Sequence, residues 1–172
     1  TIASAAQGAL SFTVTPGSPD PQVLILHTHA TETYQTWDTP VYDPDFTART
    51  KDTTLNMCAV GEAMTKVLND AGITTLHDTT LHDSPSYTES YARSAQTARR
   101  YLEEYPSIKV VLDVHRDAME SGDARVRPLT TLDGQPTAQV MIIAGCNNGG
   151  TVQLPNWRLN LCFAAKWEER ME

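Results

Sequence analysis

The chain contains three short, mainly apolar segments. The segments between them carry apolar residues at helical spacing. The apolar segments at residues 23–27, 73–77 and 109–115 are short and without strict alternation, which is typical of buried strands. Residues 57–71 and 86–105 place apolar side chains three or four positions apart, which predicts two helices. Strands that alternate with helices predict an α/β fold, with a mainly parallel twisted sheet flanked by helices.

The two ends of the chain follow other patterns. Residues 1–21 are small, polar and then proline-rich, so we expect a lead-in segment, with a short strand at residues 10–14. The domain proper is expected over residues 22–172, and helical spacing predicts a last helix at residues 157–168. A polar loop of about 25 residues follows the first strand, and loops of that length in compact domains are often functional.

Turn and cap residues sharpen these boundaries. The region from Arg125 to Cys146 predicts a β-hairpin with Asp133-Gly134 in its turn. Ser86 and Glu89 have the spacing of a capping box, which predicts the start of the second helix.

Composition excludes several classes of protein. The chain has 172 residues, a net charge of -8 and no dense run of Lys or Arg, so we expect no nucleic-acid binding. It contains 40% hydrophobic and 20% charged residues, as an ordinary globular domain does. No apolar run reaches the roughly 18 residues of a membrane span. Because the sequence starts at Thr1, we expect a mature or trimmed fragment.

The apolar strands predicted at residues 23–27 and 109–115 each end on a histidine. His27 and His115 close apolar strands, and the carboxyl ends of parallel strands meet at one edge of a sheet. Neutral imidazole is a zinc ligand, and Glu32 or Asp52 could add a carboxylate. Two histidines, one carboxylate and a water are the ligand set of catalytic zinc hydrolases. The alternative is a polar strand end whose histidines have a structural role.

Neighbouring residues have candidate supporting roles. His29 has two interpretations: it faces the site and supports the ligands from behind, or alternation along an extended strand end points it away from His27. Asp113 should share a strand face with His115 and accept its second N–H. For the next two residues, two interpretations stand: a surface ion pair, or Arg116 binding an anionic substrate group while Asp117 orients an imidazole.

Other reactive side chains predict little chemistry. His77 and His82 lie in a polar region, so we expect surface histidines. Cys58 and Cys162 fall in apolar helical patterns, which predicts buried thiols, and with Cys146 they make an odd number without a close pair. The sequence contains no G-x-S-x-G nucleophile motif.

Four blocks of the sequence resemble one known family. "VLILHTHATETY" (23–34) resembles the H-T-H-x-x-E-S-Y signature of the stage II sporulation protein P family, and "VLDVHRDA" (111–118) resembles its D-I-H-R-D strand. "TLNMCAVGEAMTKVLNDAGI" (54–73) and "PNWRLNLCFA" (155–164) resemble two further segments. All four blocks stand in the family's order over about residues 22–168, so the resemblance is more specific than any single motif.

The resemblance implies an amidase-like fold and a zinc-dependent N-acetylmuramoyl-L-alanine amidase. Such enzymes cut the amide between muramic acid and the stem peptide of peptidoglycan, and this family is also credited with cleaving peptide crosslinks. By this resemblance His27 and His115 bind zinc. Glu32 is the preferred third ligand, although "DTTLNM" also resembles the wider amidase group, in which the acid at Asp52 would bind.

The resemblance also implies a setting. It predicts an extracytoplasmic protein held by a membrane anchor upstream of Thr1, facing septal peptidoglycan during engulfment. The partners that it implies are stage II sporulation proteins D and M.

One departure from the family concerns the catalytic acid/base. The family places a glutamate at the end of a last strand, beyond the segment that ends here at Glu172, and Glu168 and Glu169 lie in a predicted helix instead. We therefore assign no catalytic residue and expect a C-terminally truncated domain with little or no activity. The alternatives are a non-catalytic wall-binding module with the same fold, and an unrelated metallohydrolase such as an esterase.

Overall fold

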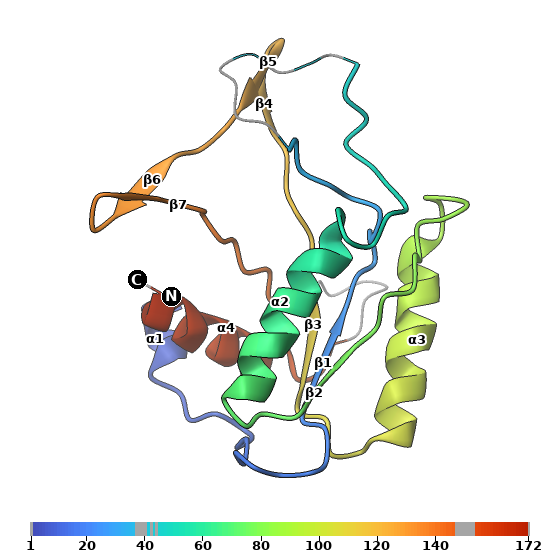
Figure 1. Ribbon diagram of the computed structural model, residues 1–172. Helices are drawn as coiled ribbons and strands as arrows, with labels where there is room; N and C mark the ends of the chain where they lie inside the picture. Colours follow the sequence, from blue (N-terminus) through green and yellow to red (C-terminus); the bar gives the residue numbers. More distant parts are fainter. Residues whose placement is uncertain (1, 37–40, 42, 44, 147–153, 172) are drawn as a thin grey trace. The chain divides into compact units, whose positions relative to one another are not determined.

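The chain forms two compact units. The computed structural model describes residues 2–36, 41, 43, 45–146 and 154–171 (Figure 1). Residues 14–126 form the larger unit, and residues 1–13 with 127–172 form the smaller one.

A three-stranded parallel sheet is the centre of the larger unit. Its strand order is β2-β1-β3, with β1 at Val23–Leu26, β2 at Thr75–His77 and β3 at Val110–Asp113. Val23 is in register with Thr75 on one side and with Val110 on the other. The predicted parallel α/β architecture is therefore confirmed for this unit.

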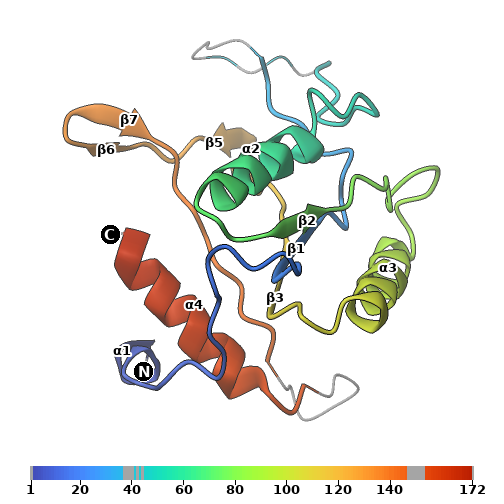
Figure 2. The same cartoon turned by 60° about the horizontal axis from the view of Figure 1, so that its bottom comes forward.

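Two helices cover the sheet. The α2 helix (Met57–Asp70) connects β1 to β2, and α3 (Ser90–Glu104) connects β2 to β3. The second connection passes β1 and reaches its other side, so right-handed crossovers place the two helices on opposite faces of the sheet. Figures 1 and 2 show α2 and α3 on either side of the strands.

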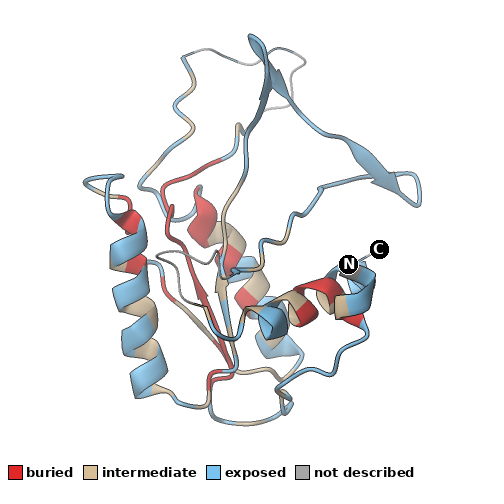
Figure 3. Ribbon diagram, turned by 180° about the vertical axis from the view of Figure 1, so that it is seen from behind, coloured by how far each residue is buried: buried red, intermediate tan, exposed pale blue. Residues whose placement is uncertain are grey.

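The core is built on the central strand. All four residues of β1 are buried, and Leu24 and Ile25 are 0% exposed. Figure 3 shows buried residues concentrated along this strand. Leu24 and Leu26 pack with Ile108, and each fully buried aliphatic side chain contributes about 1.5–3 kcal/mol. Burial on both faces explains why β1 lacks polar alternation.

The α2 helix begins at a side-chain cap. Asn56 precedes it, and its side chain accepts a hydrogen bond from the Cys58 amide at 2.9 Å. The chain leaves the helix through Gly72, whose φ of 79° suits glycine. Gly61 faces the sheet, where a Cβ atom would lie 2.5 Å from the Nε2 atoms of both His27 and His77.

The start of α3 differs from the prediction. The helix begins at Ser90, and Glu89 precedes it in the left-handed region (φ 66°) without a side-chain capping hydrogen bond. The predicted capping box at Ser86 and Glu89 is therefore wrong. Arg93 stabilises this turn instead, since its Nε donates to the His82 carbonyl at 2.6 Å and its guanidinium also donates to the Ser86 carbonyl.

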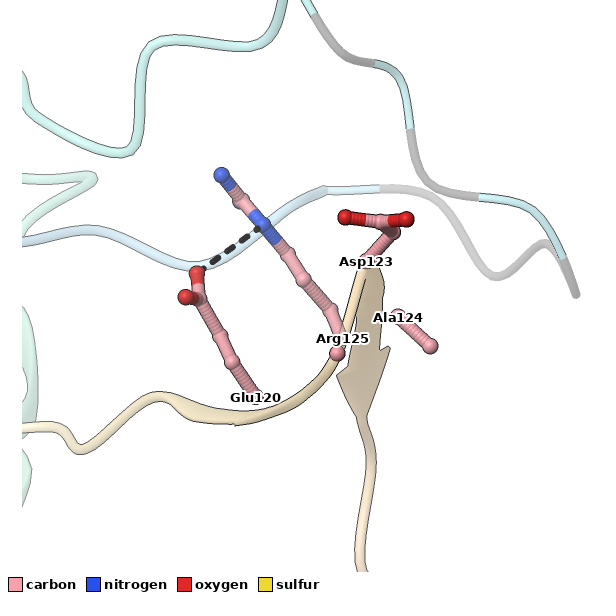
Figure 4. A pocket seen from close by; sticks show the side chains of 5 residues that line it. Glu120, Asp123, Ala124 and Arg125 are labelled. Carbon is pink, nitrogen blue, oxygen red and sulfur yellow. Dashed lines mark ion pairs between the residues drawn. The ribbon is translucent and has the colours of Figure 1, made fainter.

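A small antiparallel pair completes the larger unit. Every residue of strands β4 (Met119–Ser121) and β5 (Ala124–Val126) is exposed. Figure 4 shows the pocket at their turn, where Arg125 Nε lies 3.9 Å from Glu120 Oε1. None of the predicted metal ligands lines this pocket.

The smaller unit contains helices α1 (Ile2–Ala6) and α4 (Trp157–Met171) and strands β6 (Thr130–Leu132) and β7 (Gln135–Thr137). The α1 and α4 helices pack together. The rings of Phe12 and Phe163 also meet, 5.5 Å apart.

Several predictions fall in this second part of the chain. A hairpin was expected over residues 125–146 with Asp133-Gly134 in its turn. The β6 and β7 strands do pair around that turn, but they cover only residues 130–137, and residues 138–146 form no strand. The strand predicted at residues 10–14 is also absent. The last helix is confirmed, and Glu168 and Glu169 lie on it; Glu172 falls outside the described residues.

Candidate metal centre

Glu32 and His115 meet at the carboxyl edge of the sheet. Glu32 follows β1 by six residues, and His115 follows β3 by two. His115 Nδ1 lies 3.9 Å from Glu32 Oε2. The Glu32 side chain is 11% exposed and that of His115 is 29% exposed, so both are largely buried while His115 still reaches solvent. The structure thus brings together two of the three predicted ligands.

Asp113 fixes the orientation of His115. The Nε2 atom of His115 lies 3.0 Å from Asp113 Oδ1, as predicted from their shared strand face. This hydrogen bond, more than the opposing effect of burial, raises the pKa of His115. Thr28 donates to the same carboxylate from its amide at 2.8 Å and from its hydroxyl at 2.6 Å. Burial raises the pKa of Asp113, but the hydrogen bonds from His115 and Thr28 outweigh it and lower that pKa overall.

Glu32 is held from two sides. Its Oε2 accepts a hydrogen bond from the Arg116 amide at 3.3 Å, and its Oε1 lies 3.6 Å from a guanidinium nitrogen of Arg49. Glu32 and Arg49 also form an antiparallel backbone bridge. The carboxylate therefore has a fixed direction, with Oε2 toward His115.

Arg49 comes from the long polar loop after β1. Its NH1 lies 2.8 Å from Asp83 Oδ2, and the Asp83 side chain is 0% exposed. The Thr31 hydroxyl donates to the same Asp83 oxygen at 2.7 Å. Arg49 therefore stabilises a buried carboxylate while it pairs with Glu32.

His27 lies apart from this pair. Its side chain is fully buried between β1 and α2, where Nδ1 is 2.9 Å from the Val114 carbonyl and Nε2 is 3.0 Å from His77 Nε2. Burial, above all, lowers the pKa of His27. Both ring nitrogens are thus used within the chain, and no described contact joins His27 to Glu32.

His29 lies on the side of the metal-ligand pair. Its ring centroid is 5.3 Å from that of His115, and its Nδ1 is 3.5 Å from the Ser90 hydroxyl. His29 lies in the turn that follows β1, where the Glu32 amide donates to the His29 carbonyl at 3.1 Å, so the alternation expected of an extended strand end does not apply. This turn places His29, rather than His27, beside His115. Burial lowers the pKa of His29.

The remaining histidines are interior. The His77 side chain is 6% exposed and that of His82 is 1% exposed, so the prediction of surface histidines is wrong. His82 Nδ1 lies 2.8 Å from the His27 carbonyl, and its Nε2 lies 2.9 Å from the Thr97 hydroxyl. His82 thereby satisfies a backbone carbonyl at the end of β1, which the polar sequence around it did not indicate.

Asp52 and the residues after His115 have local roles. Asp52 is exposed and accepts hydrogen bonds from the Thr54 amide and hydroxyl, at 2.9 and 2.6 Å, which lower its pKa. The Asp117 carboxylate accepts from the Ala118 amide. Arg116 donates from its guanidinium to the Ala48 carbonyl at 3.2 Å, and its Nε is buried without a hydrogen-bond partner among the described residues.

The cluster has the donor types of a zinc site, but its side chains are not arranged as three close ligands. Two imidazoles and a carboxylate are the donors of catalytic zinc sites. Within residues 2–36, 41, 43, 45–146 and 154–171, however, no three His, Cys, Asp or Glu side chains stand close enough to hold a metal ion. The cluster is a pair of donors with a third ring beside it.

Sequence reasoning missed the residues that complete this site. Arg49 lies in the long polar loop after β1, and the length of that loop was its only signal. Asp83 lies six residues after β2, the same spacing that Glu32 has after β1. Tyr87 and Tyr91 precede and begin α3, and their spacing of four could have placed them on one side of the helix start. Their rings contact His29, at 4.4 and 5.2 Å between centroids.

Fold and cluster together define an α/β protein with imidazole and carboxylate side chains at the carboxyl edge of a parallel sheet. Comparison with known proteins gives the family. The chain belongs to the stage II sporulation protein P (SpoIIP) family, whose profile matches residues 11–172. The family's name connects its members to sporulation.

One relative sets the extent of the match. Stage II sporulation protein P of Bacillus subtilis (strain 168) is 27% identical over 129 residues, which cover 72% of this chain and 30% of that protein. The chain thus spans less than a third of its relative. No solved structure matches the chain, so the amidase-like fold stays a prediction. No helix in the described residues is long and apolar enough to cross a membrane.

Proposed function

We propose that this chain carries the metal site of a zinc-dependent N-acetylmuramoyl-L-alanine amidase. The reaction is hydrolysis of the amide between muramic acid and the stem peptide of peptidoglycan, during engulfment; peptide crosslinks are a second substrate bond. The observation that carries the proposal is the Glu32–His115 pair, 3.9 Å apart and backed by Asp113. Membership of the family supports the sporulation setting.

Glu32, His115 and His29 are the proposed zinc ligands. His29 replaces the predicted His27, because the His27 ring nitrogens already face Val114 and His77. His29 is proposed as the third ligand because its ring lies beside that of His115, with 5.3 Å between the centroids. When bound, zinc lowers the pKa of its water to about 7 and polarises the scissile carbonyl.

The protein side chains prepare the site. Asp113 accepts the Nε2 proton of His115, so the lone pair of the neutral ring is on Nδ1, toward Glu32. In the metal-free chain Asp113 favours the charged ring, as the raised pKa of His115 shows. Metal uptake therefore displaces a proton from His115, and zinc affinity rises with pH.

Arg116 is the proposed contact for the substrate beside the scissile amide. Its backbone amide holds Glu32, and its Nε donor has no partner among the described residues. A buried donor without an acceptor costs stability unless a ligand satisfies it. A carbonyl or carboxylate oxygen of the stem peptide can accept a hydrogen bond from this Nε. This role agrees with the interpretation of Arg116 as an arginine that binds an anionic substrate group.

The expected setting of the protein is part of the proposal. We infer an extracytoplasmic protein with a membrane anchor upstream of this segment, acting with stage II sporulation proteins D and M. Family membership supports this, and co-purification of the three full-length proteins from sporulating cells would test it.

Zinc content tests the proposed ligands directly. Metal-free protein would be reloaded with zinc, dialysed and measured by elemental analysis, with circular dichroism to check the fold. We expect about one zinc per chain, lost in Glu32→Gln, His115→Ala and His29→Ala, and retained in the matched variant His27→Ala. Loss in His27→Ala with retention in His29→Ala would reinstate the original ligand set. No zinc in the wild-type chain would refute the metal site.

A non-catalytic wall-binding module is the second candidate. The observation in its favour is that the described residues form no ready group of three metal donors. Hydrolysis separates the two functions: purified sacculi would be incubated with the zinc-loaded full-length protein, and newly exposed alanine amino groups would be counted. Binding to sacculi without release of amino groups would favour the module.

A further inference from the structure

Two exposed tyrosines flank the metal-ligand pair. Tyr87 is 58% exposed and Tyr91 is 63% exposed, although both are large aromatic side chains. Scattered exposed aromatics need no explanation, but here two of them adjoin the same histidine. The His29 ring stacks on Tyr87 at 4.4 Å and 6°, and meets Tyr91 at 5.2 Å and 84°.

The tyrosine rings are fixed in place by their neighbours. The guanidinium carbon of Arg49 lies 4.9 Å from the centroid of the Tyr87 ring, an attractive cation–π distance. The Tyr91 ring is 6.4 Å from that of His115, at 26°. Arg93 ties the turn before α3 to the carbonyls of Ser86 and His82. The surface is therefore preorganised, which reduces the entropy lost when a ligand binds.

Tyr91 presents the more open ring of the two. One face of Tyr87 is covered by His29, whereas His29 meets Tyr91 edge to face. An aromatic face is electron-rich and attracts the polarised C–H bonds of a ligand. A pyranose ring has such C–H bonds on its faces and hydroxyl groups around its rim, where Arg49 and the two phenol hydroxyls can hydrogen-bond.

The proposed reaction decides what lies beside the tyrosines. An amide held at Glu32 and His115 has a sugar on its acyl side and a peptide on its amine side. Tyr91 is an exposed ring 6.4 Å from the His115 ring, and Tyr87 adjoins the site through His29. Arg116 follows His115 directly and has the donor suited to the peptide.

We propose that Tyr87 and Tyr91 form a carbohydrate subsite that binds the muramic-acid side of the substrate. Tyr91 stacks on the sugar ring, while Tyr87 and Arg49 hydrogen-bond to the hydroxyl groups around that ring. This assignment rests on the proposed amidase function, but sugar binding by the tyrosines can be measured without hydrolysis.

The probe is a glycan oligosaccharide of alternating N-acetylglucosamine and N-acetylmuramic acid, stripped of its peptides. Its affinity for the zinc-loaded chain would be measured by calorimetry and by NMR titration. We expect Tyr91→Ala to weaken binding about threefold to tenfold, the contribution of one aromatic contact, and Tyr91→Phe, which keeps the ring and loses only the hydroxyl, to weaken it less. Leu102→Ala is the control, since Leu102 is 43% exposed farther along the same helix.

Each outcome separates this inference from the metal site. Binding that weakens more in Tyr91→Ala than in Tyr91→Phe and not in Leu102→Ala, with zinc content unchanged, supports the subsite. No binding of the glycan, or equal binding by Tyr91→Ala, overturns it even if zinc and amide hydrolysis are found. Competition at Tyr91 by free stem peptide, with none by the glycan, also overturns it. Glycan binding through Tyr91 in a chain that holds no zinc would keep the subsite and reject the hydrolase.

Discussion

Gly61→Ala tests the packing between α2 and the sheet. The added methyl group would lie 2.5 Å from His27 Nε2 and 2.8 Å from His27 Cε1, and 2.5 Å from His77 Nε2. His27 cannot turn aside easily, because it is fully buried and its Nδ1 contacts the Val114 carbonyl. The two rings must separate, and their 3.0 Å contact would be lost.

The magnitude follows from three contributions. Overpacking a core costs about 1–3 kcal/mol. Loss of the hydrogen bond between His27 and His77 costs about 1 kcal/mol. Alanine in place of glycine favours the helix by about 1 kcal/mol. We therefore expect Gly61→Ala to lower the free energy of unfolding by about 1–3 kcal/mol.

Urea denaturation followed by circular dichroism measures this change. Ala63→Gly is the matched control, since Ala63 is exposed on the same helix and reports propensity alone. In the double variant Gly61→Ala, His77→Ala we expect a smaller loss than the sum of the two single losses, because one of the clashing rings is gone. A Gly61→Ala chain about 1 kcal/mol more stable than wild type, as propensity alone requires, would refute the reasoning.

Three further predictions concern charged groups around the site. Arg49→Gln should lower the free energy of unfolding by about 1–3 kcal/mol in urea, because the buried Asp83 carboxylate loses its cation; an unchanged midpoint would contradict this. Asp113→Asn should lower the pKa of His115 in the metal-free chain, measured by NMR titration, because the carboxylate is the main cause of its elevation. The pKa of His27 is lower in the folded chain than its ordinary value of 6.5. As the pH falls, the unfolded chain therefore binds a proton at His27 before the folded chain does. The folded chain should lose stability as the pH falls below about 6.5. His27→Gln should flatten that acid side of the stability profile.

The regular elements of the larger unit could be predicted because their sequence pattern is local. The apolar run of β1 and the helical spacing of α2 depend on neighbouring residues, and both elements end within a residue of the prediction. The start of α3 could not be predicted in this way. The pattern at Ser86 suits a capping box, but there Arg93 draws the turn toward the His82 carbonyl.

The site was predictable only in part, because its residues depend on long-range contacts. The strand-end position of His115 and its partner Asp113 follow from alternation along β3. Which of the two histidines after β1 faces His115 depends on how the chain turns beyond the strand. The partner of His27 is His77, 50 residues away, and no local pattern indicates that contact.

The three thiols divide between the two units in a useful way. Cys58 is buried in the larger unit, where burial raises its pKa to about 11, and Cys162 is buried in the smaller unit, while Cys146 is exposed. A thiol-reactive label should therefore modify Cys146 at once and reach the other two only when their own unit opens. With Cys146 replaced by serine, mass spectrometry can follow the labelling of Cys58 and Cys162 separately. The rate at Cys58 then reports opening of the larger unit, and the rate at Cys162 reports opening of the smaller one.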